Sequence, residues 1–227
     1  MKKITSKNIL LVVFILVQNF LIAQTISSLN NTENKLPIKT ISFGQKIDFP
    51  YVENSSTWII KNTTSNSSIN LSGTQINDFV FENPGTFEIL YSDNLAHLKE
   101  DCNHAHFPAK TILEVSPVNM TFDFSKITFS EVIKKQTNYD NVIVTVPVKI
   151  NTYQNKQQSV SIPNAFVAGI DVNLKLIPAS NEIIAKNGIE TLNYKLSGIV
   201  KNETYLMFDF KDCNNQVQTY NLLDKIY

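Results

Sequence analysis

The sequence predicts an all-β protein made of two tandem antiparallel β-sandwich domains behind an N-terminal signal peptide. Three observations support this prediction. Short runs of alternating or β-branched residues follow one another along the chain, turn-forming residues separate these runs, and no long segment shows the apolar period of a helix. The 227-residue chain is long enough to form one large hydrophobic core or two small ones.

Residues 1–23 have the pattern of a secretory signal peptide. Lysines follow the initiator methionine, an apolar run covers 9–23, and the small residue Ala23 precedes a polar stretch. A bilayer span needs about 20 apolar residues, and this run is shorter and is interrupted by Gln18 and Asn19. We therefore expect cleavage after Ala23, no stable transmembrane anchor, and export to a bacterial periplasm, to the cell surface or into the medium.

The charge balance argues against a polyanionic partner. The chain has 20 basic and 20 acidic residues, and all the basic ones are lysine. Lys2, Lys3 and Lys7 precede the predicted cleavage site and every acidic residue follows it, so the processed chain has a net charge of −3. It therefore has no basic field for nucleic acid. Without arginine it also lacks the side chain best suited to bidentate anion binding.

The first predicted domain covers residues 38–116 and follows a polar, flexible leader over 24–37. Its predicted strands are 40–49, 57–61, 69–71, 76–82, 85–92 and 110–115. Asn83-Pro84-Gly85 predicts a turn, because proline fixes one backbone angle and glycine accepts angles that other residues avoid. This spacing of short strands is typical of an antiparallel sandwich.

Three short motifs occur in order within this domain. They are Trp58-Ile59-Ile60, Phe79-Val80-Phe81 and Asn83-Pro84-Gly85-Thr86-Phe87-Glu88-Ile89. Together they resemble the bacterial immunoglobulin-like domains of the PKD type over roughly residues 39–116. In that family an early tryptophan packs in the core and a Pro-Gly-Thr turn leads into the penultimate strand. The chain departs from the family where Ile59-Ile60-Lys61-Asn62 replaces an Asp-Phe-Gly-Asp-Gly-like turn. The resemblance implies an immunoglobulin-like fold with a spacer or binding role.

The second predicted domain covers residues 117–227, and Ser116-Pro117 forms the joint between the two domains. Its predicted strands are 118–124, 127–133, 142–152, 160–162, 166–177, 182–186, 189–196, 205–210 and 217–222. Asn187-Gly188 predicts a tight hairpin between two of them, because both central positions of that turn need positive φ. A second hairpin turn is predicted over 212–215.

A group of possible metal ligands lies in a predicted loop of the first domain. All three histidines, His97, His104 and His106, lie within ten residues, and Cys102 lies among them. If 102–106 is extended, Cys102, His104 and His106 share one face. Imidazole and thiolate are ligands that zinc and copper(I) accept. The sequence therefore offers a metal site of these four residues as one possibility.

Two other roles for Cys102 remain open. Exported proteins commonly oxidise their cysteines, so Cys102 could form a disulfide with Cys213, the only other cysteine. A bridge requires Cα atoms within about 7 Å, and an end-to-end arrangement of the two sandwiches would place these residues further apart. The third possibility is an exposed polar loop with no bound metal and no bridge.

The sequence contains no catalytic motif that we recognise. There is no Gly-x-Ser-x-Gly elbow and no phosphate-binding glycine loop among its six glycines. We therefore expect a non-enzymatic exported module that acts by binding a protein or glycan partner or by spacing other domains, with no cofactor unless zinc or copper binds. The first alternative is a metal-binding exported protein, and the second is a small hydrolase of an unrecognised type.

Overall fold

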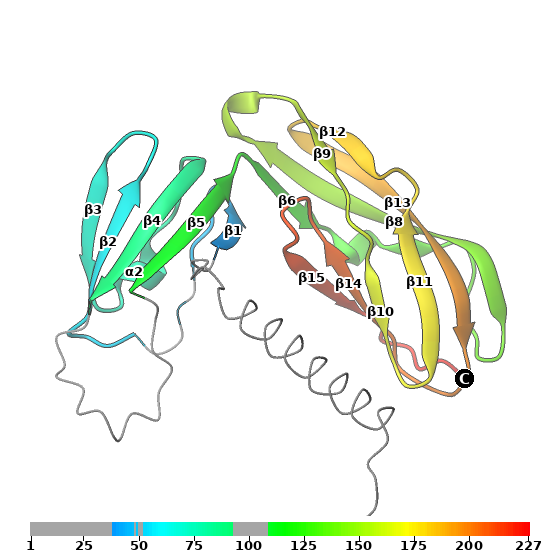
Figure 1. Cartoon of the computed structure of the whole chain (residues 1–227). Helices are drawn as coiled ribbons and strands as arrows, with labels where there is room; N and C mark the ends of the chain where they lie inside the picture. The colour runs from blue at the N-terminus through cyan, green and yellow to red at the C-terminus, as the bar shows by residue number, and fades with distance from the viewer. Residues whose placement is uncertain (1–37, 48, 50–51, 93–108) are drawn as a thin grey trace, which may run out of the picture. The chain divides into compact units, whose positions relative to one another are not determined.

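The computed structural model describes residues 38–47, 49, 52–92 and 109–227. Residues 38–227 form one compact unit of the chain. Regular structure in the described residues is mostly β-strand, arranged in several sheets, which confirms the predicted all-β fold class (Figure 1). The predicted signal peptide, residues 1–23, and the predicted leader, residues 24–37, lie outside the described residues.

The first sheet contains five strands in the order β1-β5-β4-β2-β3. They are β1 (Ile38–Ser42), β2 (Thr57–Asn62), β3 (Ser68–Ser72), β4 (Gly85–Ser92) and β5 (Lys110–Ser116). Three of the pairings are antiparallel, as the sequence predicts, but β1 runs parallel to β5. Parallel pairing requires a long crossover, and the chain between these two strands contains the rest of the sheet.

Residues from the strands and from the connections between them form the core against this sheet. Trp58 and Ile60 of β2 are buried, whereas Thr57 and Ile59, which alternate with them, are exposed. This alternation follows the two-residue period of a strand. Connecting residues complete the core, and they include Ile47, Ile76 and Phe81. The Trp58 indole N–H donates a hydrogen bond to Ser56 Oγ at 3.1 Å, so the buried ring keeps a polar partner.

The predicted strand over 76–82 is wrong. Its first residues form the short helix α2 (Gln75–Asp78), and only Phe81 makes an isolated bridge, to Gln45. The Asn77 side chain both accepts from Phe49 N and donates to Phe49 O, at 3.1 and 3.3 Å. The hydrogen bonds of the Asn77 side chain favour the helical turn over the strand that the alternating pattern predicts. No helix among the described residues is long and apolar enough to cross a membrane.

The second half of the unit contains the remaining sheets. Their elements are β6 (Val118–Phe122), η1 (Phe124–Lys126), β7 (Thr128–Phe129), β8 (Asn138–Thr152), η2 (Tyr153–Asn155), β9 (Gln158–Ser161), β10 (Phe166–Ala168), β11 (Val172–Pro178), β12 (Glu182–Ala185), β13 (Gly188–Val200), β14 (Met207–Lys211) and β15 (Val217–Asn221). One sheet has the order β11-β13-β8-β6, with β7 also paired to β8. A three-stranded sheet has the order β10-β14-β15, and β9 pairs with β12 alone.

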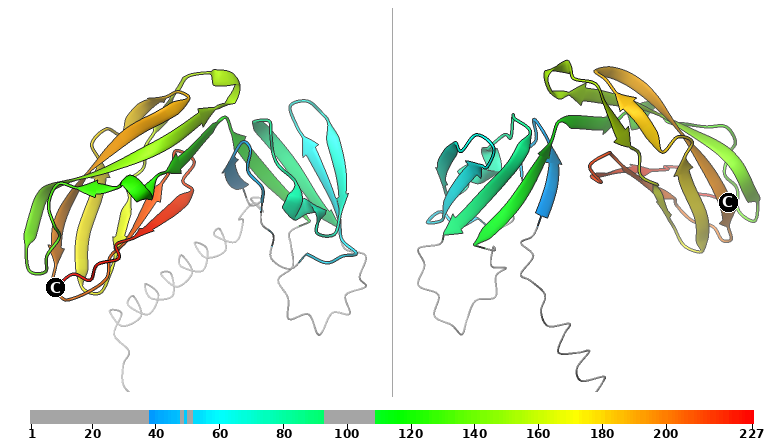
Figure 2. Two further views of the ribbon diagram at one scale, coloured as in Figure 1. Left: turned by 180° about the vertical axis from the view of Figure 1, so that it is seen from behind. Right: turned by 45° about the horizontal axis from the view of Figure 1, so that its top comes forward.

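The two larger sheets of this half face each other and bury a second hydrophobic core, separate from the first (Figures 1 and 2). Every second residue of β8 from Val142 to Ile150 is fully buried, as expected for a strand with one face toward a core. Tyr194 of β13 packs edge-on against Phe210 of β14, with ring centroids 5.1 Å apart. These contacts across the layers are those of a β-sandwich.

On one side of this sandwich, a backbone hydrogen bond connects the two facing sheets. The predicted strand 166–177 is in fact two strands, β10 and β11, which belong to different sheets. Asp171, between them, has a positive φ of 52°, typical of a turn. Ala165 N donates to Leu176 O at 3.1 Å, so the chain entering β10 is hydrogen-bonded to the opposite sheet.

The predicted Asn187-Gly188 hairpin is also wrong. β12 pairs with β9, whereas β13 begins at Gly188 and pairs with β8 and β11. Asn187 Oδ1 instead accepts hydrogen bonds from the backbone and the hydroxyl of Thr152, at the end of β8. The Asn-Gly pair therefore directs the chain from one sheet to another. The predicted turn over 212–215 is confirmed, since it connects β14 to β15.

Candidate protein-binding groove

The four candidate metal ligands lie outside the described residues. His97, Cys102, His104 and His106 fall within 93–108, so the predicted metal site stays a prediction. The described residues contain no group of three or more His, Cys, Asp or Glu side chains that could hold a metal ion. The predicted bridge between Cys102 and Cys213 also stays a prediction, because only Cys213 is described.

Cys213 lies in the turn between β14 and β15, which its neighbour Asp212 organises. Asp212 Oδ1 accepts from the backbone N–H groups of Asn214 and Gln216, each at 2.8 Å. Asp212 is only 1% exposed, and its Oδ2 has no hydrogen-bond partner among the described residues. Burial raises the pKa of the Asp212 carboxyl. Burial and the nearby Asp212 charge raise the pKa of the half-buried Cys213 thiol to about 12. A thiol with this pKa is protonated at neutral pH and is a poor nucleophile.

The side of the sandwich that begins at this turn is closed by side-chain amides. The edge strand β15 runs beside the edge strand β6 of the other sheet, in the same direction. Gln218 Oε1 accepts from Phe122 N at 3.0 Å, and its Nε2 donates to Met120 O at 2.9 Å. Asn214 Nδ2 donates to Val118 O at 2.9 Å. These amides supply the partners that a further strand would give to the exposed edge of β6.

Aromatic rings close the middle of the same side. Tyr220 of β15 lies between Phe124 and Phe129, with ring centroids 5.7 and 6.4 Å away. Phe129 also contacts Phe208 of β14 at 5.5 Å. The two sheets are therefore held together by ring packing at this level.

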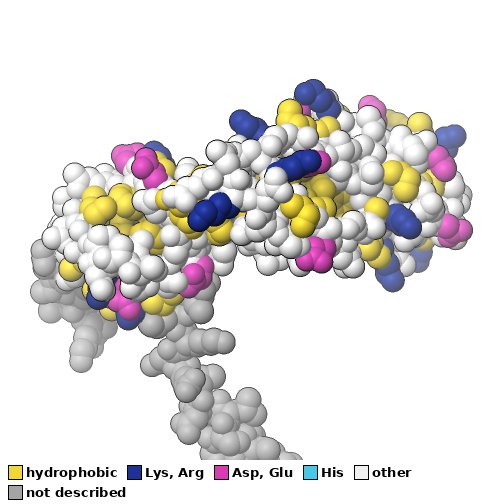
Figure 3. Space-filling model, turned by 90° about the horizontal axis from the view of Figure 1, so that it is seen from above, with side chains coloured by type: hydrophobic (Ala, Val, Ile, Leu, Met, Phe, Trp, Pro, Cys, Tyr) yellow, Lys and Arg dark blue, Asp and Glu magenta, His cyan; other side chains and the backbone are white. Residues whose placement is uncertain are grey.

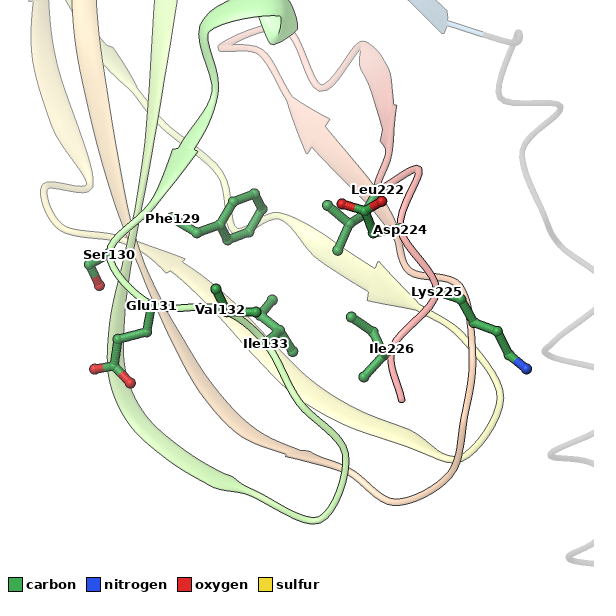
Figure 4. A pocket seen from close by; sticks show the side chains of 9 residues that line it. All are labelled: Phe129, Ser130, Glu131, Val132, Ile133, Leu222, Asp224, Lys225 and Ile226. Carbon is green, nitrogen blue, oxygen red and sulfur yellow. The ribbon is translucent and has the colours of Figure 1, made fainter.

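Beyond the rings the two edges separate and leave a cavity of about 400 Å³, which we call the edge groove. One wall is the chain after β7 and the other is the chain after β15. Its lining residues are Phe129, Ser130, Glu131, Val132, Ile133, Leu222, Asp224, Lys225 and Ile226. Figure 4 shows Phe129 and Ile133 on one wall and Leu222 and Ile226 on the other, with these side chains directed toward the space between the walls. The interior of the groove is therefore largely apolar.

The first wall is fixed by a buried tyrosine. Tyr139 OH accepts from Lys134 N at 2.6 Å and donates to Val132 O at 3.2 Å. One hydroxyl thus holds both ends of a three-residue segment that has no regular secondary structure. These two hydrogen bonds fix the backbone of this wall, and a fixed wall loses little conformational freedom on binding.

The far end of the groove is closed by contacts between the two walls. Lys135 N donates to Tyr227 O at 3.3 Å. The Glu203 carboxylate accepts from the ammonium groups of Lys135 and Lys225, both at 3.0 Å. These hydrogen bonds lower the pKa of Glu203, and the bond to Glu203 raises the pKa of Lys225. The walls are therefore joined beyond the groove as well as before it.

Large apolar side chains are exposed on or next to the walls of the groove. Val132, which lines the groove, is 76% exposed, and Leu223 and Tyr227, which are adjacent in sequence to lining residues, are 87% and 72% exposed. Single exposed apolar residues are ordinary, but a cluster around an apolar hollow is typical of an interaction site. The Lys225 ammonium lies 5.3 Å from the Tyr227 ring centre and adds a charged group to this rim.

The sequence prediction missed this groove because it treated 127–133 and 217–222 as ordinary strands. A usable signal was present. In Val132-Ile133 and Leu222-Leu223 two large apolar residues are adjacent, and neighbours in a strand point to opposite faces. Only one of each pair can enter the core, and the structure buries Ile133 while it exposes Val132 and Leu223.

A second hollow, of about 650 Å³, lies against the first sheet. Its lining is rich in hydroxyl and amide side chains around Phe79, Phe81 and Phe87. Some of these polar groups already have partners, because Asn62 Oδ1 accepts from Thr64 N and Ser65 N at 2.9 and 3.0 Å. The edge groove is therefore the better candidate site.

Comparison of the chain with protein-family models, with curated proteins and with solved structures gives no match.

Proposed function

We propose that the chain is an exported, non-enzymatic binding module of a bacterial periplasm or cell surface, and that it binds a protein partner at the edge groove. The observation that carries this proposal is the groove itself, an apolar hollow with fixed walls and an exposed apolar rim. Such a hollow loses little order and removes much apolar surface from water when a partner enters.

The charge distribution supports a polypeptide partner rather than a polyanion. On the face shown in Figure 3, lysine and acidic side chains are interspersed with apolar ones, and neither charge forms a continuous patch. A face without a continuous basic patch lacks the electrostatic footprint of a nucleic-acid site. The export part of the proposal depends on the signal-peptide pattern of residues 1–23.

The proposal can be tested with a phage library of random dodecapeptides, selected on the immobilised exported chain. We expect peptides to be enriched that lose binding to Val132→Glu and to Leu222→Glu, because each change places a charge among the apolar residues that line the groove. Ile189→Glu is the matched control, since Ile189 is 71% exposed but does not line the groove.

Equal binding to all three variants would place the site elsewhere on the molecule. The absence of any enrichment over a blank surface would count against a binding role and favour the spacer role that the sequence also suggested.

A further inference from the structure

Within the proposed binding function, we infer that the edge groove takes an extended peptide strand with alternating apolar residues and a neighbouring lysine or arginine. The inference depends on the groove being a binding site, and it adds the conformation and chemistry of the ligand. Three features of the groove support it: unpaired backbone groups, the position and length of the groove between two chain edges, and one carboxylate.

The walls present backbone donors that have no partner. Among the described residues, the N–H groups of Glu131, Val132 and Ile133 make no hydrogen bond, and the same holds for the N–H groups of 223–225. Neighbouring N–H groups of an extended segment point to opposite sides, so alternate ones, such as those of Glu131 and Ile133, can face the same chain. A chain placed between two such edges can accept hydrogen bonds from these donors with its carbonyl groups, as in strand addition to a sheet edge. A compact small molecule would leave most of them unpaired.

The position of the groove fits an inserted strand. Before the groove, the same two edges are joined by Gln218 and then by the ring of Tyr220. In the groove no side chain performs this role, so a guest strand would continue the closure of the sandwich. The first wall, residues 129–133, is at most about 13 Å long at the rise of an extended chain, which suits a strand of four to five residues. Alternate side chains of such a strand would enter the apolar interior of the groove.

One carboxylate gives the groove a charge preference. Asp224 lines the groove, and Figure 4 shows its carboxylate beside Leu222, whereas the Glu131 carboxylate points away from the cavity. Neither carboxylate forms an ion pair with a described residue. By contrast, Lys225 is already bound to Glu203. The remaining charge that can interact with a ligand in the groove is therefore negative, which favours a cationic residue in the peptide.

The experiment uses a fluorescein-labelled heptapeptide, Lys-Val-Thr-Val-Thr-Val-Lys, and the ¹⁵N-labelled exported chain. We expect weak binding, with Kd between about 10 μM and 1 mM, and slower hydrogen exchange at the amides of 131–133, 223–225 or both. Replacement of central peptide amides by esters should weaken binding several-fold, because an ester carbonyl is a weaker hydrogen-bond acceptor for the wall N–H groups than an amide carbonyl. A peptide of the same composition with the valines adjacent should also bind less well.

Two conservative variants test the charge preference. Asp224→Asn should weaken binding of the lysine peptide several-fold and should remove its advantage over a peptide with glutamate in place of lysine. Glu131→Gln, the matched control, should change neither value. Equal effects of the two variants would overturn the assignment of the charge preference to Asp224.

Other results separate this inference from the proposed function. If library peptides bind at the rim but are insensitive to replacement of their amides by esters and protect no wall amide, strand addition is wrong and the binding role stands. If neither the library nor the heptapeptide binds, both are wrong. Concentration-dependent protection of the wall amides without peptide would show that a second copy of the chain occupies the groove, and would overturn the inference.

Discussion

Asp212 has two carboxylate oxygens in different surroundings. Oδ1 accepts two backbone hydrogen bonds, whereas the buried Oδ2 has no partner among the described residues. Burial disfavours the charged form and raises the pKa above the ordinary value of 3.8. The folded state then binds a proton more tightly than the unfolded state. The stability of the fold should therefore fall as pH rises from the ordinary value through the raised one.

Replacement of Asp212 separates its charge from its hydrogen bonds. Asp212→Asn keeps the Oδ1 acceptor and removes the charge, so it should flatten the fall in stability above about pH 4. Asp212→Ala removes the acceptor as well and should be about 1–3 kcal/mol less stable than the Asn variant. Urea unfolding of both variants between pH 4 and pH 8 measures these effects. An unchanged pH dependence in Asp212→Asn would show that Asp212 is ionised in the fold without penalty.

Cys102 is the second residue whose state has a direct test. If Cys102 forms a bridge to Cys213, which is one of the three possibilities that the sequence leaves open, iodoacetamide should label no cysteine in the denatured protein until a reductant is added. Labelling of both cysteines in denaturant alone would exclude the bridge. In that case about one equivalent of zinc or copper, lost on His104→Ala, would identify the metal site instead. If both measurements are negative, the loop carries neither feature.

At the scale of elements, the contact between β15 and β6 depends on one side chain. Gln218→Met keeps the length of the side chain but leaves Phe122 N and Met120 O without partners. We expect the free energy of unfolding to fall by about 1–3 kcal/mol. Val217→Ala on the opposite face of β15, where the side chain is half exposed, should cost less than about 1 kcal/mol. Similar losses in both variants would show that strand propensity, and not the amide contact, determines the effect.

Strand positions could be predicted wherever alternation and turn residues agreed. The core residues of β2 and β8 follow the two-residue period, and the turn after β14 follows from Asp212 and Asn215, which has a φ of +61°. The prediction failed where a side-chain amide formed hydrogen bonds with a distant part of the backbone. Asn77 bonds to Phe49, and its segment forms a helical turn although its apolar residues alternate. Asn187 bonds to Thr152, and the chain there passes to another sheet and does not form a hairpin. The sequence does not show which distant backbone group such an amide will meet.

The groove could not be predicted because it depends on how the edges of two different sheets lie against each other. Its walls, 129–133 and 222–226, are about ninety residues apart in the chain. The two walls lie apart in space because the contacts of Gln218 and Tyr220, which join the same two edges, end before the groove begins. Adjacent apolar pairs indicated exposed side chains, but they could not show that the two pairs flank one hollow.

At the scale of the whole molecule, the described residues contain two separate hydrophobic cores. Only Pro117 separates β5 from β6, so the strand that ends the first sheet leads directly into the second half. This agrees in position with the predicted joint at Ser116-Pro117. The prediction of two independently folding domains can be checked only by expressing each half.

Export is the prediction that concerns the whole chain. We expect the protein recovered from outside the cytoplasm to begin at Gln24, because Ala23 is the small residue at the end of the apolar run. N-terminal sequencing of the recovered protein measures this directly. Substitution of Ala23 by a bulky residue should slow cleavage and leave a longer protein with the apolar run attached. Recovery of an unprocessed chain in the cytoplasm would contradict the export proposal.

The parallel pairing of β1 with β5 has a mechanical consequence. Residues 38–42 lie beside 112–116 in register, and both strands point the same way. A pull toward the N-terminus on β1 and toward the C-terminus on β5 acts along the strands in opposite directions. This force loads all the backbone hydrogen bonds between the two strands at the same time, in shear. The bonds therefore do not break one after another, as they do when two strands are pulled apart from one end. A chain that spans a gap between two tethered bodies would resist tension best with this arrangement at the entry to its first sheet.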